Sequence, residues 1–472
     1  MLDQFAAHLE SSGLIPFGSR LAVAFSGGAD STCLLHLTHR LGLQPIALHL
    51  DHGQRAESMQ EAMELAAFCE SIGVPFASGR ADVPALAASY RVGIEEAGRI
   101  ARYDFFRQAA FRMGCDLVAT GHTRDDLAET VVFNLARGTG MAGLAGIPAV
   151  RDGIVRPLLP FSRQQTRTYC SEQGLKTIED PGNLDLTFSR VRLRHRVIPE
   201  LEAAHSGAVA NIARTAGILS EENAFLDAMA AAVMEKCEVH MNGPLRFLTQ
   251  DVECAFDRSV FLSHPPVLQR RGLRLAAGVL GASMEYQTTS LAVEMIGIGG
   301  PGSISLAESV VDLQIDGGVF QMAKRVVDEP FRYSLVTPGV TESEVFGWQI
   351  TVRPWNPDLP VRDKDNLDVV VDAEALQGQL YFRSAHHSLK MTPLGMDGTK
   401  QVTHLMAEAK LTKAARKRLP VVCDMVGPVW VPGCRIAERV KITDTCARAF
   451  RLTIGPLEGA GRQEEQERID PT

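Results

Sequence analysis

Paired cysteines are missing from this 472-residue chain. Its nine cysteines are scattered along the sequence, and no two of them have the Cys-x-x-Cys spacing. This absence argues against a zinc ribbon and an iron–sulfur cluster, and the scatter gives no support to a disulfide scaffold. We therefore expect reduced thiols that mostly fill space in a packed interior.

Long apolar runs are missing as well. No uninterrupted apolar stretch reaches the length of a membrane span, and residues 1–20 carry Asp3 and Glu10 without an apolar core segment. The sequence therefore predicts a folded, soluble protein with no membrane partner, located in the cytoplasm. It leaves open whether the protein is a monomer or a homodimer.

Positive charge is in deficit, because 48 Lys and Arg residues face 56 Asp and Glu residues, for a net charge of −8. At face value this balance argues against a nucleic-acid partner. Net charge averages over surfaces, however, so the local distribution of basic residues must decide. The length and a hydrophobic content of 45% allow a large core divided among two to four domains.

No Walker loop and no Gly-x-Gly-x-x-Gly comes after the first apolar run, Leu21–Phe25. The run leads instead into a turn of small and polar residues, Ser26-Gly27-Gly28-Ala29-Asp30-Ser31. A strand, a glycine turn and a helix start direct several backbone N–H groups at one point, which is a phosphate-binding arrangement. Ser31 can donate its hydroxyl there, and Asp30 can hold Mg²⁺. The plain alternative is a capped helix after a glycine turn.

Strand-like and helix-like segments alternate over the first 180 residues. The expected strands are Leu21–Phe25, Pro45–Leu50, Pro75–Ala77 and Cys115–Thr120, and the expected helices are 30–41, 57–72, 82–89 and 95–113. This alternation predicts an α/β fold, a parallel sheet wrapped by helices. Ligands bind such sheets off the carboxyl ends of the strands, so the residues after each strand are candidates for chemistry.

The segment after the expected strand Cys115–Thr120 carries the richest chemistry. If a helix starts near His122, then His122, Asp126 and Glu129 lie within roughly 60° of one another on one helical face. Such a face can bind a metal ion or an ammonium group. The alternative is a solvated first helical turn with acids near its positive end. The next turn along the chain, Arg137-Gly138-Thr139-Gly140, can close over a cleft.

Three other segments carry weaker signals. Asp51-His52-Gly53-Gln54-Arg55 leaves a strand end, where it can contact a nucleoside or form a plain turn. Glu95, Arg99 and Arg102 share one helical face, either as a salt-bridge ladder or as cations aimed at a triphosphate. Basic residues cluster in 189–196 and in 410–418, where they either contact a nucleic-acid backbone or solvate a helix.

Taken together, these residues resemble the tRNA(Ile)-lysidine synthetase family of PP-loop ATP pyrophosphatases. The resemblance rests on the order and spacing of eight segments: Ser26–Ser31, Asp51–Arg55, Ile94–Tyr103, His122–Thr130, Arg137–Gly140, Arg156–Leu159, Asp180–Asn183 and Arg190–Arg194. It covers the first two hundred residues well and the rest loosely, through Lys390–Met396 and Val429–Ile436. Gly182 and Val191 depart from the usual serine and asparagine, at positions with no expected chemical role.

The resemblance implies an ATP-dependent ligase that acts on tRNA(Ile) with a CAU anticodon. ATP would adenylate the oxygen at position 2 of the wobble cytidine and release pyrophosphate. The amine of L-lysine would then displace AMP, giving lysidine and changing the codon read from AUG to AUA. The cofactors implied are ATP and Mg²⁺.

The resemblance also implies roles for residues of this sequence. ATP would be bound by Ser26, Gly27, Gly28, Ala29, Asp30 and Ser31, and Mg²⁺ by Asp30. The catalytic residues would be Asp30, Arg99, Arg102 and His122, and lysine would be bound by Asp126 and Glu129. For tRNA binding we expect Arg190, Arg192, Arg194, Lys413, Arg416, Lys417 and Arg418.

Two other functions stay open on the residues alone. One keeps ATP pyrophosphatase chemistry with another nucleophile, as in a tRNA thiolase or an amidotransferase. The lack of paired cysteines and of an amidotransferase's catalytic cysteine counts against it. The other is a non-catalytic tRNA-binding scaffold, against which the retained Asp30, His122, Asp126 and Glu129 argue.

Four regions are expected along the chain. The PP-loop catalytic domain spans 1–204, a helical linker and middle domain 205–328, a small α/β or strand-rich tRNA-binding domain 329–457, and a disordered acidic tail 458–472. A long alanine-rich helix is expected over 205–235. The strands expected in the third region are Gln349–Val352, Leu367–Val371, Pro428–Val431 and Phe450–Ile454.

Overall fold

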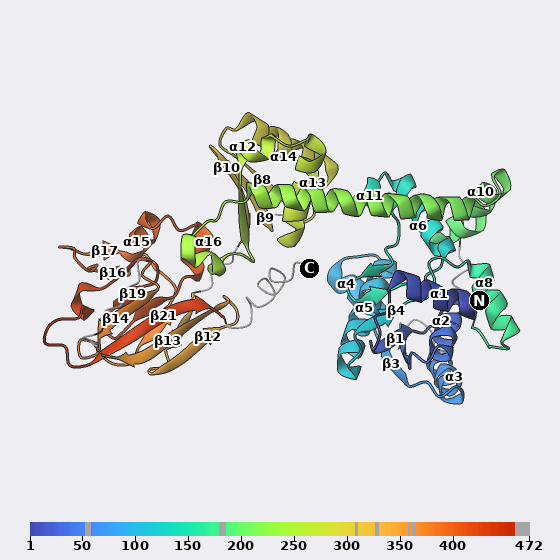
Figure 1. Cartoon of the computed structure of the whole chain (residues 1–472), viewed down its shortest axis with the longest axis horizontal. Helices are drawn as coiled ribbons and strands as arrows, with labels where there is room; N and C mark the ends of the chain where they lie inside the picture. Colours follow the sequence, from blue (N-terminus) through green and yellow to red (C-terminus); the bar gives the residue numbers. More distant parts are fainter. Residues whose placement is uncertain are drawn as a thin grey trace. The chain divides into compact units, whose positions relative to one another are not determined.

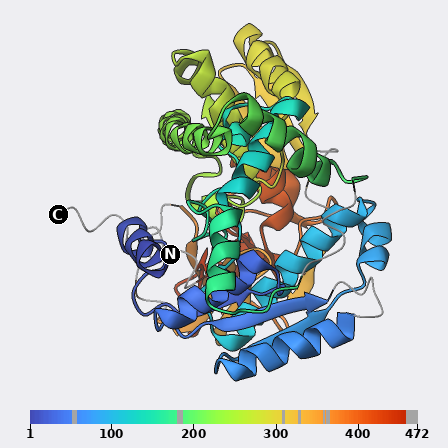
Figure 2. The same ribbon diagram turned by 90° about the vertical axis from the view of Figure 1, so that its right-hand side faces the viewer.

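The chain divides into two compact units, Met1–Phe225 and Leu226–Thr472. The computed structural model describes residues 1–51, 58–178, 186–306, 310–325, 330–356, 359 and 365–457. The division falls inside α11 (Ala208–Cys237), a 30-residue helix seen from the side in Figure 1 and end-on in Figure 2. No helix among the described residues is long and apolar enough to cross a membrane.

The first unit is built on one six-stranded sheet. Its strands are β1 (Leu21–Ala24), β2 (Ile46–Asp51), β3 (Phe76–Arg80), β4 (Leu117–Ala119), β5 (Val150–Arg151) and β6 (Ile154–Val155). The order across the sheet is β3-β2-β1-β4-β6-β5, and only β5 pairs antiparallel. The predicted parallel α/β sheet is therefore confirmed.

Helices cover both faces of this sheet because successive strand residues point to opposite sides. Leu21 and Val23 face a core shared with α1 (Leu2–Ser12), α2 (Ala29–Arg40), α3 (Ser58–Ser71) and α8 (Arg163–Glu172). Ala22 faces a second core against α5 (Ile94–Met113). Figure 1 shows α2 and α3 on one side of the sheet and α4 (Val83–Tyr90) and α5 on the other.

The strand order reverses at β1, which has β2 on one side and β4 on the other. Val23 of β1 pairs with Ala47 of β2 and with Ala119 of β4. A parallel sheet opens a crevice at such a reversal, outside the carboxyl ends of the strands. The turn Ser26–Ser31 comes after β1, and the segment from Thr120 comes after β4, so both candidate segments lie at this crevice.

The remaining elements of the first unit lead from the sheet to α11. They are α6 (Arg124–Arg137), α7 (Met141–Leu144), α9 (Ser189–Arg192), the π-helical turn η2 (Leu193–Val197) and α10 (Ile198–Ala204). Two segments of the predicted series, His52–Arg55 and Asp180–Asn183, lie outside the described residues.

The middle of the chain is not only helical, which corrects the expectation for 205–328. After α11 come η3 (Gly243–Leu248) and helices α12 (Arg258–Leu262), α13 (Pro266–Val279) and α14 (Tyr286–Ile298). They accompany a four-stranded antiparallel sheet of β7 (Glu253–Asp257), β10 (Val319–Lys324), β9 (Val311–Asp316) and β8 (Gly302–Leu306), in that order. Apolar and polar residues alternate along β9, in step with its alternating burial, and the two-residue turn Gly317-Gly318 leads into β10. Both features are hairpin signals that sequence reasoning missed.

The C-terminal part is rich in strands, as predicted. One sheet runs β11 (Arg332–Ser334), β15 (Tyr381–Arg383), β18 (Val421–Cys423), β19 (Pro428–Val431) and β20 (Arg435–Ile436), and another runs β12 (Gly339–Ser343), β13 (Trp348–Trp355), β21 (Ala449–Pro456) and β14 (Asp368–Asp372). Shorter elements are β16 (Lys390–Met391), β17 (Lys400–Gln401), α15 (Val402–Glu408), α16 (Lys413–Arg418) and η5 (Glu438–Val440). Both sheets pack on one core that contains the fully buried Trp348 and Trp430.

The predicted domain boundaries after residues 204, 328 and 457 stay predictions. The expected tail, 458–472, lies outside the described residues.

We expect Gly27→Ala to destabilise the first unit more than Gly42→Ala. Both glycines have a left-handed backbone, with φ of +80° and +73°, so each substitution carries about 1 kcal/mol of backbone strain. Only at Gly27 would the new Cβ also collide, lying 2.7 Å from Leu65 Cδ2. Overpacking should add about 1–2 kcal/mol. Urea unfolding of both variants tests this, and equal losses would contradict it.

Candidate active site

The turn after β1 presents unsatisfied amides at the start of α2. Gly28 precedes this helix in an extended conformation, and no side chain caps its first turn. Ser31 organises the turn, since its hydroxyl donates to the Gly28 carbonyl at 3.0 Å and accepts from the Ser26 amide at 3.2 Å. Free helix-start amides behind a glycine turn can bind a phosphate group.

A second loop touches this turn at Gly121. A Cβ at Gly121 would lie 3.0 Å from the backbone carbon of Asp30 and 3.0 Å from the Ser31 nitrogen. Backbone atoms at that distance cannot yield as a flexible side chain can, so any side chain at residue 121 would be crowded. This close approach brings the loop that carries His122 directly beside the phosphate turn.

His122 precedes the helix rather than lying on it, which corrects the predicted helix start. Helix α6 begins at Arg124, with Thr123 as its N-cap. The His122 ring instead shares a 2.8 Å hydrogen bond between its Nδ1 and the Thr120 hydroxyl. The wheel argument for His122, Asp126 and Glu129 therefore fails for the histidine.

His122 is neutral at physiological pH. Burial lowers its pKa to about 4, and the arginines at 156, 102 and 190 add to that effect against the opposing charge of Asp126. A neutral imidazole amid several guanidinium groups can accept or share a proton without adding positive charge. Those cations make the surroundings of His122 favourable for an anion.

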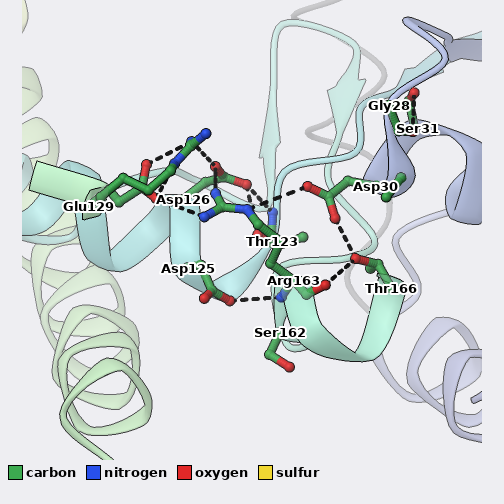
Figure 3. A network of polar contacts seen from close by, with 12 residues as sticks. Gly28, Asp30, Ser31, Thr123, Asp125, Asp126, Glu129, Ser162, Arg163 and Thr166 are labelled. Carbon is green, nitrogen blue, oxygen red and sulfur yellow. Dashed lines mark hydrogen bonds and ion pairs between the residues drawn. The ribbon is translucent and has the colours of Figure 1, made fainter. Parts of the chain in front are cut away.

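Asp126 and Glu129 lie together, and two arginines contact both of them (Figure 3). Arg163 donates to Asp126 Oδ1 at 2.6 Å and to Glu129 Oε1 at 3.0 Å. Arg194 donates to both oxygens of Glu129, at 2.8 and 3.0 Å, and approaches Asp126 at 3.4 Å. This pair of carboxylates attracts cationic nitrogen groups. The lysine-binding role of Asp126 and Glu129 stays a prediction.

Asp126 also closes the start of α6. Its Oδ2 accepts from the Thr123 amide and from the Thr123 hydroxyl, each at 2.8 Å. Burial opposes the ionisation of Asp126, but Arg163 and the Thr123 bonds outweigh it and lower the pKa of the carboxyl. Asp126 is therefore held ionised and fixed in direction.

The side chain of Asp30 connects the phosphate turn, Ser26–Ser31, to the cluster of Asp126, Glu129 and Arg163. The Thr166 hydroxyl donates to its Oδ1, and Arg163 Nε lies 3.8 Å from its Oδ2. Burial raises the pKa of Asp30 to about 6, against the opposing effects of Thr166 and Arg163. A partly desolvated carboxylate whose negative charge is only partly neutralised suits Mg²⁺. This ion is commonly held by one or two carboxylates together with substrate phosphates.

The predicted arginines of α5 differ in their surroundings. Arg102 acts electrostatically on His122. Both side chains are exposed, and the Arg99 guanidinium lies 5.3 Å from the centre of the Tyr103 ring. Of the two, Arg102 is therefore the one that shares the surroundings of His122.

Sequence reasoning assigned no role to Arg156 and Arg163. Arg156 is 5% exposed and donates to the Pro148 carbonyl at 2.8 Å, and its charge lowers the pKa of the buried His122. Arg163 opens α8 behind the capping box of Ser162 and Gln165. The Ser-x-x-Gln signature could have located this helix start, and Arg163 with it.

The predicted tRNA-binding residues of the two basic segments differ in their exposure and contacts. Arg190 and Arg192 are exposed, whereas Arg194 turns onto Glu129. Lys413 is exposed, Lys417 is half-buried, and Arg416 donates to the Leu411 carbonyl. Arg418 is 8% exposed, donates to the Leu248 carbonyl at 2.9 Å and is paired with Asp251. Its expected exposure to RNA is therefore wrong, because residue 418 lies on the inner face of a short helix.

We expect Asp30→Asn to stabilise the protein, and to do so more strongly at pH 8 than at pH 4.5. The carboxyl's pKa is raised from 3.8 to about 6, so its ionised form is disfavoured by folding. The free-energy cost of ionising Asp30 in the folded protein develops between about pH 4 and pH 6. At higher pH it stays constant, on the order of 1–3 kcal/mol.

Thermal melts across pH measure this effect, with the exposed Asp3→Asn as the matched control. A gain from Asp30→Asn that does not grow with pH would contradict the assignment of burial as its cause.

Two families match parts of this chain. Residues 3–201 match the PP-loop domain, and residues 380–452 match the TilS substrate C-terminal domain. The first match contains the phosphate turn, His122, Asp126 and Glu129.

Relatives match nearly the whole chain. The tRNA(Ile)-lysidine synthase of Geobacillus kaustophilus is 30% identical over 451 residues, covering 92% of this chain and 95% of its own. That of Symbiobacterium thermophilum is 29% identical over 475 residues, covering 96% and 98%. The order of the two domains, the crevice at β1 and these full-length likenesses agree, and the chain belongs to the tRNA(Ile)-lysidine synthase family.

Proposed function

We propose that this protein ligates L-lysine to carbon 2 of the wobble cytidine in the CAU anticodon of tRNA(Ile), using ATP. The observation that carries the proposal is the pairing of Asp126 and Glu129, as a site for cationic nitrogen, with a phosphate-binding turn only one loop away. An adenylating enzyme with an amine as its nucleophile needs those two sites side by side.

The first step joins the cytidine oxygen to the α-phosphate of ATP. The amides of the turn Ser26–Ser31 hold the phosphates, and the positive charge of Arg102 and Arg156 offsets the charge that builds up as pyrophosphate leaves. Mg²⁺, when bound at Asp30, neutralises phosphate charge. Attack by the cytidine carbonyl oxygen leaves positive charge on the cytosine ring, and neutral His122, oriented by Thr120, can take up a proton that the ring then gives up.

The second step replaces AMP by lysine. Asp126 and Glu129 attract the side-chain ammonium of lysine and hold its nitrogen against carbon 2, which bears the adenylated oxygen. The nitrogen forms the new bond to carbon 2, the bond from carbon 2 to oxygen breaks, and AMP leaves with that oxygen. Two protons leave the nitrogen during this exchange, one before attack and one after it.

Binding of tRNA is assigned to basic side chains other than those that pair with Asp126 and Glu129. Arg190 and Arg192 of α9 precede the residue that contacts Glu129, so they would bring the RNA backbone to the lysine site. Lys413, Arg416 and Lys417 of α16 supply a second cationic surface in the C-terminal part. Phosphate contacts of this kind supply affinity and position, whereas choice between tRNAs needs further contacts.

The test is an assay of both steps with a tRNA(Ile) transcript carrying CAU. We expect pyrophosphate release without lysine, AMP release only with lysine, and neither with a tRNA(Met) transcript. Lysine-independent AMP release would exclude this function.

Glu129→Gln should keep pyrophosphate release within about threefold and raise the lysine KM at least about tenfold, because one charge-assisted contact to the ammonium is lost.

If Glu129→Gln instead slows both steps equally, then Glu129 does not belong to the lysine site. Such a result would leave the overall reaction standing, since the two-step assay of the wild-type protein tests that separately.

We expect Arg192→Gln and Lys413→Gln each to weaken tRNA binding and to reduce the slope of log K against log salt by about 0.7–0.9. Arg418→Gln should leave that slope unchanged and lower the free energy of unfolding instead, because its partners Asp251 and the Leu248 carbonyl lose a buried cation. Filter binding at four salt concentrations, with urea unfolding alongside, separates the two effects. A reduced slope for Arg418→Gln would contradict its placement.

A further inference from the structure

Arg163 lies among three carboxylates that serve different steps. Its Nη2 is 2.6 Å from Asp126, its Nη1 is 3.0 Å from Glu129, and its Nε is 3.8 Å from Asp30 (Figure 3). The side chain is 16% exposed, and that of Glu129 is 6% exposed. One guanidinium therefore joins the acids assigned to lysine with the acid assigned to the phosphates.

The backbone around Arg163 fixes this position. Asp125 Oδ2 accepts from the Arg163 amide at 2.8 Å, which ties the start of α8 to α6. One residue earlier, the Ser162 amide donates to Gln165 Oε1 at 2.8 Å. One turn later, Thr166 donates from the same helix to Asp30. The first turn of α8 thus contacts both parts of the site at once.

The charge balance poses a chemical problem for the lysine step. Two carboxylates attract an ammonium, but the same carboxylates hold its proton and so disfavour the free amine that must attack. A fixed cation beside them weakens that effect. Arg163 is such a cation, and burial of its charge is outweighed by Asp126 and Glu129, which raise its pKa above the usual value.

We propose that Arg163 is a positioning residue that partly neutralises Asp126 and Glu129, so that bound lysine loses its proton near neutral pH. This inference rests on the proposed function, since it concerns the second step of that reaction. Arg194 also contacts both carboxylates, but of the two arginines only Arg163 forms an ion pair with Asp30 among the described contacts. Arg163 therefore links the charge of the lysine site to that of the phosphate site.

The decisive readout is the pH dependence of the lysine step in single turnover. The full-length enzyme is first incubated with ATP and tRNA(Ile) to form adenylated tRNA, and lysine is then added between pH 6.5 and 9.5. For Arg163→Gln and Arg163→Met we expect the rise of the rate with pH to shift at least one unit upward. This is a loss of about threefold or more at pH 7.5 that is recovered near pH 9.

The lysine KM separates this role from a structural one. Removing a cation leaves the carboxylates more attractive to ammonium, so the KM should fall or stay unchanged while kcat falls. Arg163→Lys should restore most of the wild-type pH profile, because it restores a positive charge. Arg167→Gln, an exposed arginine one turn along α8, is the matched control and should not move the profile.

The outcomes are distinguishable. If the wild-type protein shows no lysine-dependent AMP release, the proposed function itself fails. If it does, but the profile of the neutral variants coincides with that of the wild type, the inference about Arg163 is overturned. It is equally overturned if those variants raise the lysine KM at every pH, or lose pyrophosphate release as well, because Arg163 would then act on folding or on the first step.

Discussion

A balance of buried charge at the edge of the parallel sheet underlies the candidate site. Asp30, Asp126 and Glu129 bring three carboxyl groups into a partly desolvated space, and Arg163 and Arg194 bring two guanidinium groups. Neither set would be stable there alone, since an unpaired buried ion is strongly disfavoured. The pairs therefore hold α2, α6, α8 and η2 around one point.

The backbone makes this balance possible. Gly27 turns the chain with a positive φ, and Gly121 lets the loop after β4 approach the start of α2 to a distance at which a side chain would be crowded. Because both loops come after neighbouring parallel strands, the reversal of strand order at β1 puts their chemistry on the same edge. The turn Ser26–Ser31 and the carboxylates of Asp126 and Glu129 therefore lie close together because of the topology of the sheet.

Most of the fold's first half could be predicted from periodicity. The predicted strand Cys115–Thr120 contains β4, and the helix expected over 95–113 corresponds to α5. Three features were not predicted. His122 was assigned to a helix that starts two residues later, because the Thr123 cap has to be recognised before the first residue of that helix can be located. The sheet of 253–324 was taken as helical, and the charge of Arg418 was taken as exposed.

The sequence by itself determined the glycine turn after β1, the order of strands and helices in the first unit, and the family, because these depend on local spacing and on residues close together in the chain. Only the tertiary structure decided which charges meet. Arg163 and Arg194 lie 34 and 65 residues from Glu129 along the chain, and no periodicity connects them. Their pairing results from how α8 and η2 pack against α6, and electrostatic partners at such separations are set by packing rather than by pattern.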